Sequence, residues 1–208
     1  MPLHIYLLGA TGRVGKVILQ NALDDGHQVS VLVRSPEKIK IKSPLLTVYQ
    51  GNVLNKIDLI NSMKQCDVVI SALNTDKKDT LSKSMPLIID AMSHYDLSRI
   101  ITIGTAGILN SRSEPNLYRF QSNESKRRST TAAEDHLSAY HILKSSNLNW
   151  TIVCPTYLPD SEVTGKYRTE INVLPENAQS ISVGDTANFA YSLLFTNTFL
   201  KTRIGIAH

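Results

Sequence analysis

The chain has 208 residues, of which 42% are hydrophobic and 19% are charged, so it is long enough to bury a core and too apolar to be disordered. Its net charge of +4 comes without a dense stripe of lysine and arginine, which argues against a nucleic-acid-binding protein. Two widely spaced cysteines and no apolar run near the roughly 20 residues of a bilayer span predict free thiols and no membrane contact. The first strand follows directly after the start, so we expect a soluble, cytoplasmic monomer without a leader, with one domain over residues 1–208.

The N-terminal stretch opens on a short apolar run, residues 5–8, which predicts a buried strand. Gly9, Gly12 and Gly15 follow it, and residues 16–23 continue at helical spacing. A strand, a glycine turn and a helix N-terminus bring several backbone N–H groups and the positive end of a helix dipole to one point, which suits a pyrophosphate. We assign Gly9 to the sharp turn, Gly12 to close approach of the phosphate and Gly15 to close helix packing. The alternative is a glycine-rich turn that binds nothing.

A second strand is expected at residues 28–33 and ends at Arg34. In dinucleotide-binding folds an acidic residue here accepts a hydrogen bond from the ribose 2′-OH of NAD, whereas an arginine pairs with the 2′-phosphate of NADP. Lys38 stands one helical turn further on, and Glu37 points elsewhere if residues 35–36 begin a turn, so we expect no carboxylate to repel the phosphate. The sequence predicts NADPH as the cofactor; the alternative is a solvated surface arginine.

The rest of the chain alternates between expected strands and helices. The strands fall at residues 45–50, 67–73, 100–104, 150–154 and 203–207. The helices fall at residues 55–65, 80–95, 130–146 and 184–195. The nearly all-apolar fourth strand is typical of a strand that is covered on both faces. This order predicts an α/β fold, a doubly wound parallel sheet of the Rossmann type with helices on both faces.

One polar segment without a clear period, residues 107–129, leaves the carboxyl end of the fifth strand. Long loops at this edge are usually functional. Its residues Leu117, Tyr118 and Phe120 could provide an apolar wall. We interpret the run Lys126-Arg127-Arg128 as a solvated charged segment rather than an anion site.

Ligands of such sheets bind at the carboxyl ends of the strands, so the active site is expected there. The ends of strands four, five and six, residues 71–74, 104–106 and 155–157, carry no Asp, Glu, His or Lys. This argues against a mechanism that needs a strong general base and is compatible with direct hydride transfer. The six histidines show no metal spacing, so we expect them at the surface or in the core and expect no metal.

Tyr140 and Lys144 have the Tyr-x-x-x-Lys spacing of many short-chain dehydrogenases and share one helix face. Helix direction argues against a catalytic pair, because a helix that follows a strand starts at the carboxyl edge and runs away from it. An α-helix rises about 1.5 Å per residue, so Lys144 lies about 20 Å from the start of the helix. We expect Tyr140 in the core and Lys144 as a favourable charge at the helix C-terminus.

Four segments resemble the atypical short-chain dehydrogenases with an NAD(P)-binding, NmrA-like fold: Gly9-Ala-Thr-Gly-Arg-Val-Gly15, Val31-Leu-Val-Arg34, Gly51-Asn-Val-Leu54 and residues 135–155. Within that family the order of features in residues 158–187 is similar to the NADPH-dependent flavin reductases, also called biliverdin-IXβ reductases. The likeness covers essentially the whole chain except the loop at 107–129.

Together with the strand ends, the resemblance gives the candidate cofactor-binding residues: Gly9, Thr11, Gly12, Arg13, Val14, Gly15, Arg34, Lys38, Asn52, Val53, Ala72, Leu73, Gly104 and Pro155. It implies that residues 11–14 hold the pyrophosphate and that Arg34 and Lys38 hold the 2′-phosphate. It further implies that Asn52 and Val53 flank the adenine, although the family usually has Asp where Asn52 stands.

The resemblance also implies that Leu73 and Thr105 border the nicotinamide, and it makes Thr105 and Tyr157 the catalytic candidates. Thr105 stands where the family has a serine, and Tyr157 where it has a histidine two residues after the proline of strand six. A tyrosine has a pKa of about 10 and cannot exchange a proton near neutral pH as histidine does. The change therefore argues more against biliverdin reduction than against flavin reduction.

The sequence thus predicts an NADPH-dependent oxidoreductase, a flavin reductase that delivers hydride to free FMN or to a related small-molecule acceptor such as biliverdin, a tetrapyrrole. Two alternatives stay open. One is a non-enzymatic, NADP-sensing NmrA-like regulator that binds another protein, and the other is a reductase of quinones or small carbonyl compounds. An open pocket over the nicotinamide favours an enzyme, and a pocket blocked by residues 107–129 favours a sensor.

Overall fold

A computed structural model describes residues 2–76, 78–125 and 129–208, which leaves the charged run at 126–128 outside the described residues. Its centre is a sheet of eight strands in that part of the chain: β1 (His4–Leu8), β2 (Gln28–Val33), β3 (Leu46–Gln50), β4 (Val68–Ser71), β5 (Arg99–Ile103), β6 (Asn149–Pro155), β7 (Arg168–Ile171) and β8 (Thr202–Ala207). The strand order is β3-β2-β1-β4-β5-β6-β8-β7, and every neighbouring pair is parallel except β7 with β8. The predicted doubly wound α/β sheet is confirmed.

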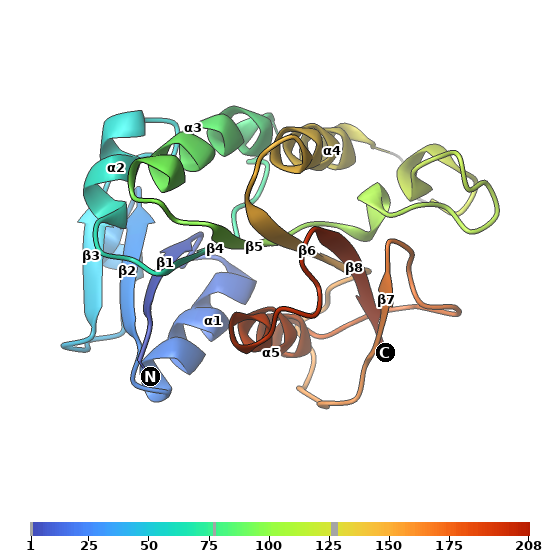
Figure 1. Cartoon of the computed structure of the whole chain (residues 1–208). Helices are drawn as coiled ribbons and strands as arrows, with labels where there is room; N and C mark the ends of the chain where they lie inside the picture. The colour runs from blue at the N-terminus through green and yellow to red at the C-terminus, as the bar shows by residue number, and fades with distance from the viewer. Residues whose placement is uncertain (1, 77, 126–128) are drawn as a thin grey trace.

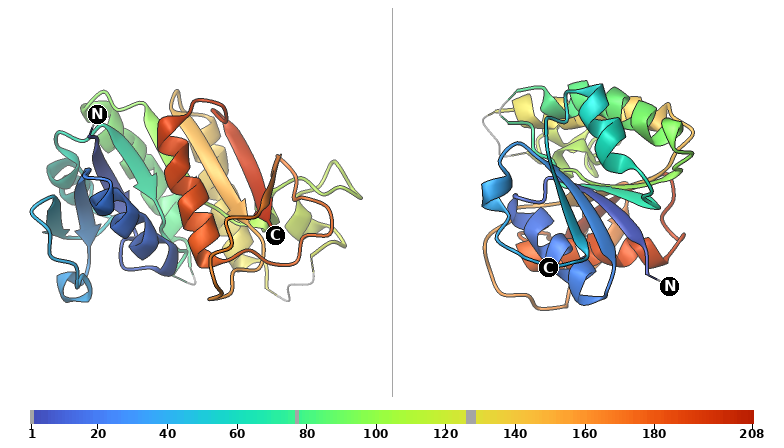
Figure 2. Two further views of the ribbon diagram at one scale, coloured as in Figure 1. Left: turned by 90° about the horizontal axis from the view of Figure 1, so that it is seen from below. Right: turned by 90° about the vertical axis from the view of Figure 1, so that its left-hand side faces the viewer.

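Helices cover both faces of the sheet (Figure 1). One face carries α2 (Lys56–Met63), α3 (Thr80–His94) and α4 (Thr131–Lys144), and the other carries α1 (Arg13–Asp24) and α5 (Val183–Ser192). The two layers are seen edge-on in the right-hand view of Figure 2. Four short 3₁₀ helices complete the described elements: η1 (Pro36–Lys38), η2 (Ala106–Ile108), η3 (Arg119–Gln121) and η4 (Leu193–Phe195). Within the described ranges no helix combines the length and the apolar character that a bilayer crossing requires.

Each central strand contributes side chains to two hydrophobic cores, one on each face of the sheet. In β4, Val69 packs into the core under α2–α4, whereas Val68 and Ile70 pack into the core under α1 and α5. Because successive side chains of a strand point to opposite faces, a strand buried on both faces must be apolar at every position. The unbroken apolar run therefore predicted the strand correctly. Cys66 and Cys154 lie in the first core as free thiols.

The strand that sequence analysis missed is β7, which lies at the sheet edge and runs antiparallel to β8. Its sequence, Arg-Thr-Glu-Ile, is mostly polar, and three of its four residues are exposed. Short, polar edge strands resist pairing with other chains, and for the same reason they carry no apolar alternation that a sequence pattern would detect. The sheet is therefore parallel throughout its centre with one antiparallel edge strand.

The order of the strands decides where a ligand can bind. The chain builds outward from β1 to β2 and β3 on one side and from β4 to β5 and β6 on the other. Between β1 and β4 the connections diverge, and the loops at the carboxyl ends of these strands leave a crevice. The glycine turn after β1 opens into this crevice.

A buried carboxylate, Asp135 of α4, fixes the first turn of α3. Its oxygens accept hydrogen bonds from the backbone N–H groups of Leu81 (3.0 Å) and Ser82 (2.9 Å) and from the Ser82 hydroxyl (2.6 Å). The first N–H groups of a helix lack partners inside the helix, so an acidic side chain from a neighbouring helix can cap them. Asp135 thereby joins α3 to α4.

We expect Asp135→Ala to lower the free energy of unfolding by about 2–4 kcal/mol, because it leaves buried N–H donors without their acceptor. Urea denaturation measures the change. The matched control is Asp90→Ala, which removes an exposed ion pair with Lys56 and is expected to cost about 0–1 kcal/mol. An effect of Asp135→Ala no larger than that of the control would contradict the capping role.

Candidate cofactor and acceptor site

The turn between β1 and α1 is built from backbone atoms in close contact. Gly9 has φ +79°, and a Cβ at this position would overlap the Ala72 carbonyl at the end of β4. A Cβ on Gly15 would overlap the Gly9 carbonyl. The Gly12 N–H donates to the Gly9 carbonyl oxygen at 2.9 Å. The tight turn and the close helix packing predicted for Gly9 and Gly15 are therefore present.

Helix α1 begins at this turn without a side-chain cap. Gly12 occupies the N-cap position in an extended conformation, no described side chain accepts from the first turn, and that turn carries no acidic residue. Val14 and Gly15 are buried against the sheet, so they offer backbone N–H groups rather than side chains. Uncapped N–H groups and the helix dipole favour an anion at this point.

A cleft of about 240 Å³ opens from the turn along the ends of β1, β2, β3 and β4. It brings together eight of the predicted residues: Gly9, Thr11, Gly12, Arg34, Asn52, Val53, Ala72 and Leu73. Of the others, Arg13 is exposed at the start of α1, Lys38 is exposed at the end of η1, and Pro155 is buried at the end of β6. Their assignment to the cofactor stays a prediction.

The turn after β3 is held by its own side chains. The Asn52 N–H donates to the Asp58 carboxylate at 2.8 Å, and the Asn52 side-chain oxygen accepts from the Leu54 N–H at 3.0 Å. The Asn55 side chain caps α2 by accepting from the Ile57 N–H at 2.9 Å. This wall of the cleft is thus held by hydrogen bonds within the protein.

Arg34 lies in the cleft, but it does not stand alone there. Its guanidinium is 2.7 Å from the carboxylate of Asp76, which comes from the loop after β4 and lines the same cleft. The expectation that no carboxylate stands near Arg34 is therefore wrong. Sequence reasoning considered the residues next to Arg34 in the chain, such as Glu37, whereas the carboxylate arrives from a segment about forty positions later.

A long segment after β6 crosses toward the glycine turn. The Arg13 guanidinium donates to the Leu158 carbonyl oxygen (2.9 Å) and to the Asp160 carboxylate (3.1 Å). Both partners belong to this segment, so Arg13 connects the start of α1 to it. An arginine that is predicted to hold pyrophosphate therefore also contacts the segment that follows β6.

Asp185 at the start of α5 anchors the far end of the same segment. Its buried carboxylate accepts from the Thr164 N–H (3.1 Å) and the Gly165 N–H (2.8 Å). Burial disfavours the charged carboxylate, but hydrogen bonds from Ser182 and His208 outweigh this effect and hold the pKa of Asp185 well below its ordinary value. The carboxylate is ionised at neutral pH and serves as a structural acceptor.

A second cavity, of about 450 Å³, lies at the ends of β5 and β6. Both catalytic candidates line it, Thr105 after β5 and Tyr157 after β6. Thr105 is 8% exposed and caps η2 by accepting from the Gly107 N–H at 3.4 Å. Tyr157 is 67% exposed, and its carbonyl accepts from the Ile181 N–H at 2.9 Å. Thr105 is thus a buried part of the cavity wall, whereas Tyr157 is exposed to solvent.

The loop after β5 forms a wall of this cavity and leaves the cavity open. Arg119, Phe120, Glu124 and Ser125 of the loop line it. Three residues of the loop were expected to form an apolar wall, and one of them, Phe120, lines the cavity. Leu117 is exposed, and Tyr118 packs beside Arg203 of β8. The loop projects beyond the sheet on the side of β8 (Figure 1).

The carboxylate of Glu124 accepts several hydrogen bonds within the described part of this loop. It accepts from the Ser111 hydroxyl (2.6 Å) and from the N–H groups of Arg112 (2.6 Å) and Ser113 (2.9 Å). Partial burial disfavours its charged form, but these hydrogen bonds outweigh burial and lower the pKa of Glu124 below its ordinary value. Glu124 is therefore ionised and engaged at neutral pH. Sequence analysis gave Glu124 no role, since these three hydrogen-bond donors lie more than ten positions away in the chain.

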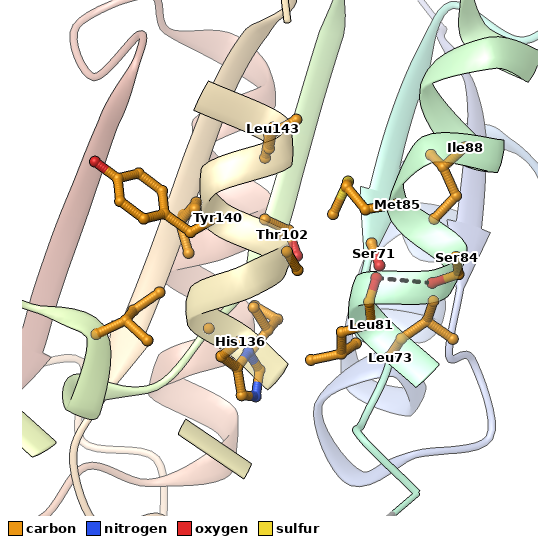
Figure 3. Close-up of a pocket in the computed structure, with 15 residues that line it drawn as sticks. Ser71, Leu73, Leu81, Ser84, Met85, Ile88, Thr102, His136, Tyr140 and Leu143 are labelled. Carbon is orange, nitrogen blue, oxygen red and sulfur yellow. Dashed lines mark hydrogen bonds between the residues drawn. The ribbon is translucent and has the colours of Figure 1, made fainter. Parts of the chain in front are cut away.

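A narrow cavity between α3 and α4 reaches the same edge from inside (Figure 3). Most of its lining is apolar, but His136 of α4 stands at one end, together with Leu73 and Gly104 among the lining residues. A Cβ on Gly104 would crowd the Ile152 side chain, so packing requires glycine there. The sequence predicts His136 only as a surface or core residue. Its position in the second turn of α4, close to the carboxyl end of β5, is the sequence feature that places it near this edge of the sheet.

Comparisons with known proteins place the chain among cofactor-binding proteins. The model of a family described as NAD(P)H-binding matches residues 9–197. A solved structure from Streptococcus pneumoniae, a proposed NADH-flavin reductase, is 27% identical with a TM-score of 0.82 over 99% of each chain. A proposed epimerase from Bacteroides thetaiotaomicron is 28% identical with a TM-score of 0.87, over 100% of this chain and 98% of the other.

Curated relatives are matched over a shorter stretch. An isoflavone reductase homolog from Nicotiana tabacum is 36% identical over 78 residues, which cover 33% of this chain and 25% of the relative. A photosystem II assembly factor from Synechocystis is 32% identical over 81 residues, 38% of this chain and 25% of that protein. The chain thus spans about a quarter of the length of the curated relatives that it matches.

Tyr140 and Lys144 line neither the cofactor cleft nor the second cavity, although Tyr140 lines the narrow cavity between α3 and α4. Tyr140 is 6% exposed, its ring meets Trp150 edge-to-face at 5.8 Å, and the Arg203 guanidinium lies 4.5 Å from its centroid. Lys144 is at the last turn of α4, with its ammonium 5.9 Å from the Tyr140 ring. Figure 3 shows the Tyr140 hydroxyl on the side of α4 opposite to Met85.

We expect Tyr140→Phe and Lys144→Ala each to leave the rate of NADPH oxidation with any acceptor within a few-fold of the wild type. Steady-state kinetics test this, with melting temperatures recorded in parallel because Tyr140 is a core residue. A loss of about a hundredfold or more, as found when a catalytic acid or base is removed, would assign the pair a catalytic role after all.

Proposed function

We propose that this chain, which belongs to the NAD(P)H-binding family, is an NADPH-dependent reductase of a flat conjugated acceptor, with free flavin as the best candidate. The observation that carries the proposal is the position of two cavities at one sheet edge. The cofactor cleft includes Leu73 after β4, and the second cavity begins at Thr105 after β5. Because β4 and β5 are neighbours, with Ser71 opposite Thr102, a nicotinamide at this boundary would face an acceptor in the second cavity.

The residues of the cleft fit the proposed cofactor. The uncapped start of α1 suits a pyrophosphate, and Arg34 at the end of β2 suits a 2′-phosphate. The shaped turn at Asn52 and Val53 would receive the adenine. When bound, the reduced nicotinamide supplies the hydride, and the protein contributes proximity and orientation.

The acceptor cavity has the chemistry of a binding site for a planar ring system. Phe120 and Tyr157 offer aromatic faces, and Thr105 offers a fixed hydroxyl. The carboxylate in the wall, Glu124, is held ionised by its hydrogen bonds and is not a proton donor at neutral pH. The residues therefore support positioning rather than general acid catalysis. Solvent reaches the exposed Tyr157 side and can provide the proton.

The open cavity also favours an enzyme over a sensor. A sensor would need no space for an acceptor, and residues 107–129 would be free to fill it. The described part of the loop instead lines the cavity. The flavin assignment draws on the resemblance noted in the sequence and on the name of the structural relative from Streptococcus pneumoniae.

Arg34→Ala is expected to weaken NADPH binding by about ten- to a hundredfold, the worth of a charge-assisted phosphate contact, and to leave NADH binding nearly unchanged. Isothermal titration calorimetry with both cofactors measures this. Lys56→Ala removes a positive charge outside the cleft and serves as the control. An NADPH affinity that is unchanged in Arg34→Ala would contradict a role of Arg34 as the phosphate receptor.

Thr105→Ala and Tyr157→Phe are expected to lower kcat/KM for FMN by about three- to thirtyfold, near the contribution of one hydrogen bond, without changing NADPH affinity. NADPH oxidation is followed by absorbance with FMN, FAD, a quinone and biliverdin.

The rate with FMN is expected to change little between about pH 6 and 8, because the strand ends offer no histidine. A bell-shaped profile centred near neutral pH that disappears in His136→Gln would show that His136 supplies the proton. No reduction of any of these acceptors would overturn the proposed function.

A further inference from the structure

The cation that would receive the 2′-phosphate is already paired in this structure. Arg34 stands at the end of β2, and Asp76 belongs to the loop after β4, with β1 between the two strands. Their charged groups meet at 2.7 Å, and both residues line the cofactor cleft. The ion pair therefore reaches across the strand that carries the glycine turn, on the side where the ribose of a dinucleotide would lie.

The backbone around Asp76 explains why its carboxylate is presented there. Asp76 has φ +50°, a left-handed conformation that Asp, Asn and Gly tolerate better than other residues. The preceding Thr75 is buried, and its N–H donates to the Asn74 side chain at 2.7 Å. The Lys78 N–H closes the turn on the Thr75 carbonyl at 2.9 Å. The turn thus holds Asp76 in place.

A carboxylate at this position has two consequences for cofactor choice. It occupies the same guanidinium donors that a phosphate needs, and it repels a phosphate because both groups are negative. An acidic side chain beside the ribose can also accept a hydrogen bond from an unmodified 2′-OH. The Asp76 carboxylate is therefore expected to weaken the binding of NADPH and not the binding of NADH.

We propose that Asp76 is a specificity-determining residue of the cofactor cleft, whose carboxylate competes with the 2′-phosphate of NADPH for Arg34 and narrows the preference for NADPH over NADH. The inference rests on the proposed function to the extent that Arg34 is the phosphate receptor. It adds that this receptor is internally occupied, so that the chain accepts both cofactors more evenly than Arg34 alone would allow.

The exposure of the pair sets the size of the effect. The Arg34 side chain is 70% exposed and that of Asp76 is 44% exposed, so solvent screens their attraction and a phosphate can displace the carboxylate. Exposed ion pairs contribute little to stability, and the competition is accordingly worth a factor of about three to ten in NADPH affinity. A free arginine at the same place would discriminate correspondingly more.

The test compares Asp76→Asn with Asp79→Asn. Asparagine keeps the shape and the left-handed backbone of residue 76 and removes its charge. Asp79 lies three positions later, pairs with Lys83 at 2.9 Å and does not line the cleft, so its variant removes the same charge from the same loop. Titration calorimetry of the whole chain with NADP⁺ and NAD⁺ gives the dissociation constants.

We expect Asp76→Asn to tighten NADP⁺ binding about three- to tenfold and to change NAD⁺ binding less than about twofold, because the amide oxygen still accepts from a 2′-OH. Asp79→Asn is expected to change both less than about twofold, since its charge is exposed to solvent, paired with Lys83 and outside the lining of the cleft. Asp76→Gly, which the backbone also tolerates, is an independent second variant. A ratio of the two affinities that is the same in Asp76→Asn and Asp79→Asn would overturn the proposal.

The same titrations in an Arg34→Ala background separate the possible failures. Competition for Arg34 requires that the gain from Asp76→Asn shrinks to less than about twofold once Arg34 is absent. An equal gain in both backgrounds would overturn the competition and leave charge repulsion as the cause. If Arg34→Ala weakens NADP⁺ but Asp76→Asn has no effect, only the role of Asp76 fails. If Arg34→Ala has no effect on NADP⁺, the proposed cofactor preference fails with it.

Discussion

The contact on which the rest of this structure depends is the approach of three backbone segments at the end of β1. Gly9 lies against the Ala72 carbonyl of the neighbouring β4 end, and Gly15 of α1 lies against the Gly9 carbonyl. A single methyl group at either glycine would separate the helix from the sheet or the turn from β4. The same closeness leaves the first turn of α1 uncapped and directed into the crevice. The close packing and the uncapped helix start thus have one cause.

Carboxylates near this edge mostly hold the protein together. Asp135 caps α3, Glu124 gathers the loop after β5, and Asp185 anchors the segment after β6. Each accepts hydrogen bonds from several N–H or O–H donors, so each is occupied by contacts within the protein. The crevice itself is lined by helix N-terminal amides and Arg34. Asp76 is the described carboxylate that pairs with Arg34 within the cofactor cleft, which is why we propose that its charge affects the choice of cofactor.

Much of the fold could be predicted because it is encoded locally. Apolar runs gave the buried strands, and the spacing of Gly9, Gly12 and Gly15 gave the turn, since both depend on neighbours in the chain. Partners that arrive from elsewhere could not be predicted. The Asp76 carboxylate crosses β1 to reach Arg34, and the loop carboxylate Glu124 folds back on residues 111–113. Strand β7 was missed because its polar residues give no hydrophobic period.

The two cavities differ in what determines their shape, and this difference bears on what each can recognise. The cofactor cleft is bounded by strand ends and tight turns whose backbone has little freedom. The acceptor cavity takes a wall from side chains of a loop that is fastened to the sheet by Arg203, which donates to the Ile108 carbonyl and to the Asn110 side chain (2.9 Å). Loop side chains can be exchanged without disturbing the sheet, whereas the glycine turn cannot. On the proposed function, acceptor choice would therefore depend on the loop after β5, and cofactor binding would depend on the crevice at β1 and β4.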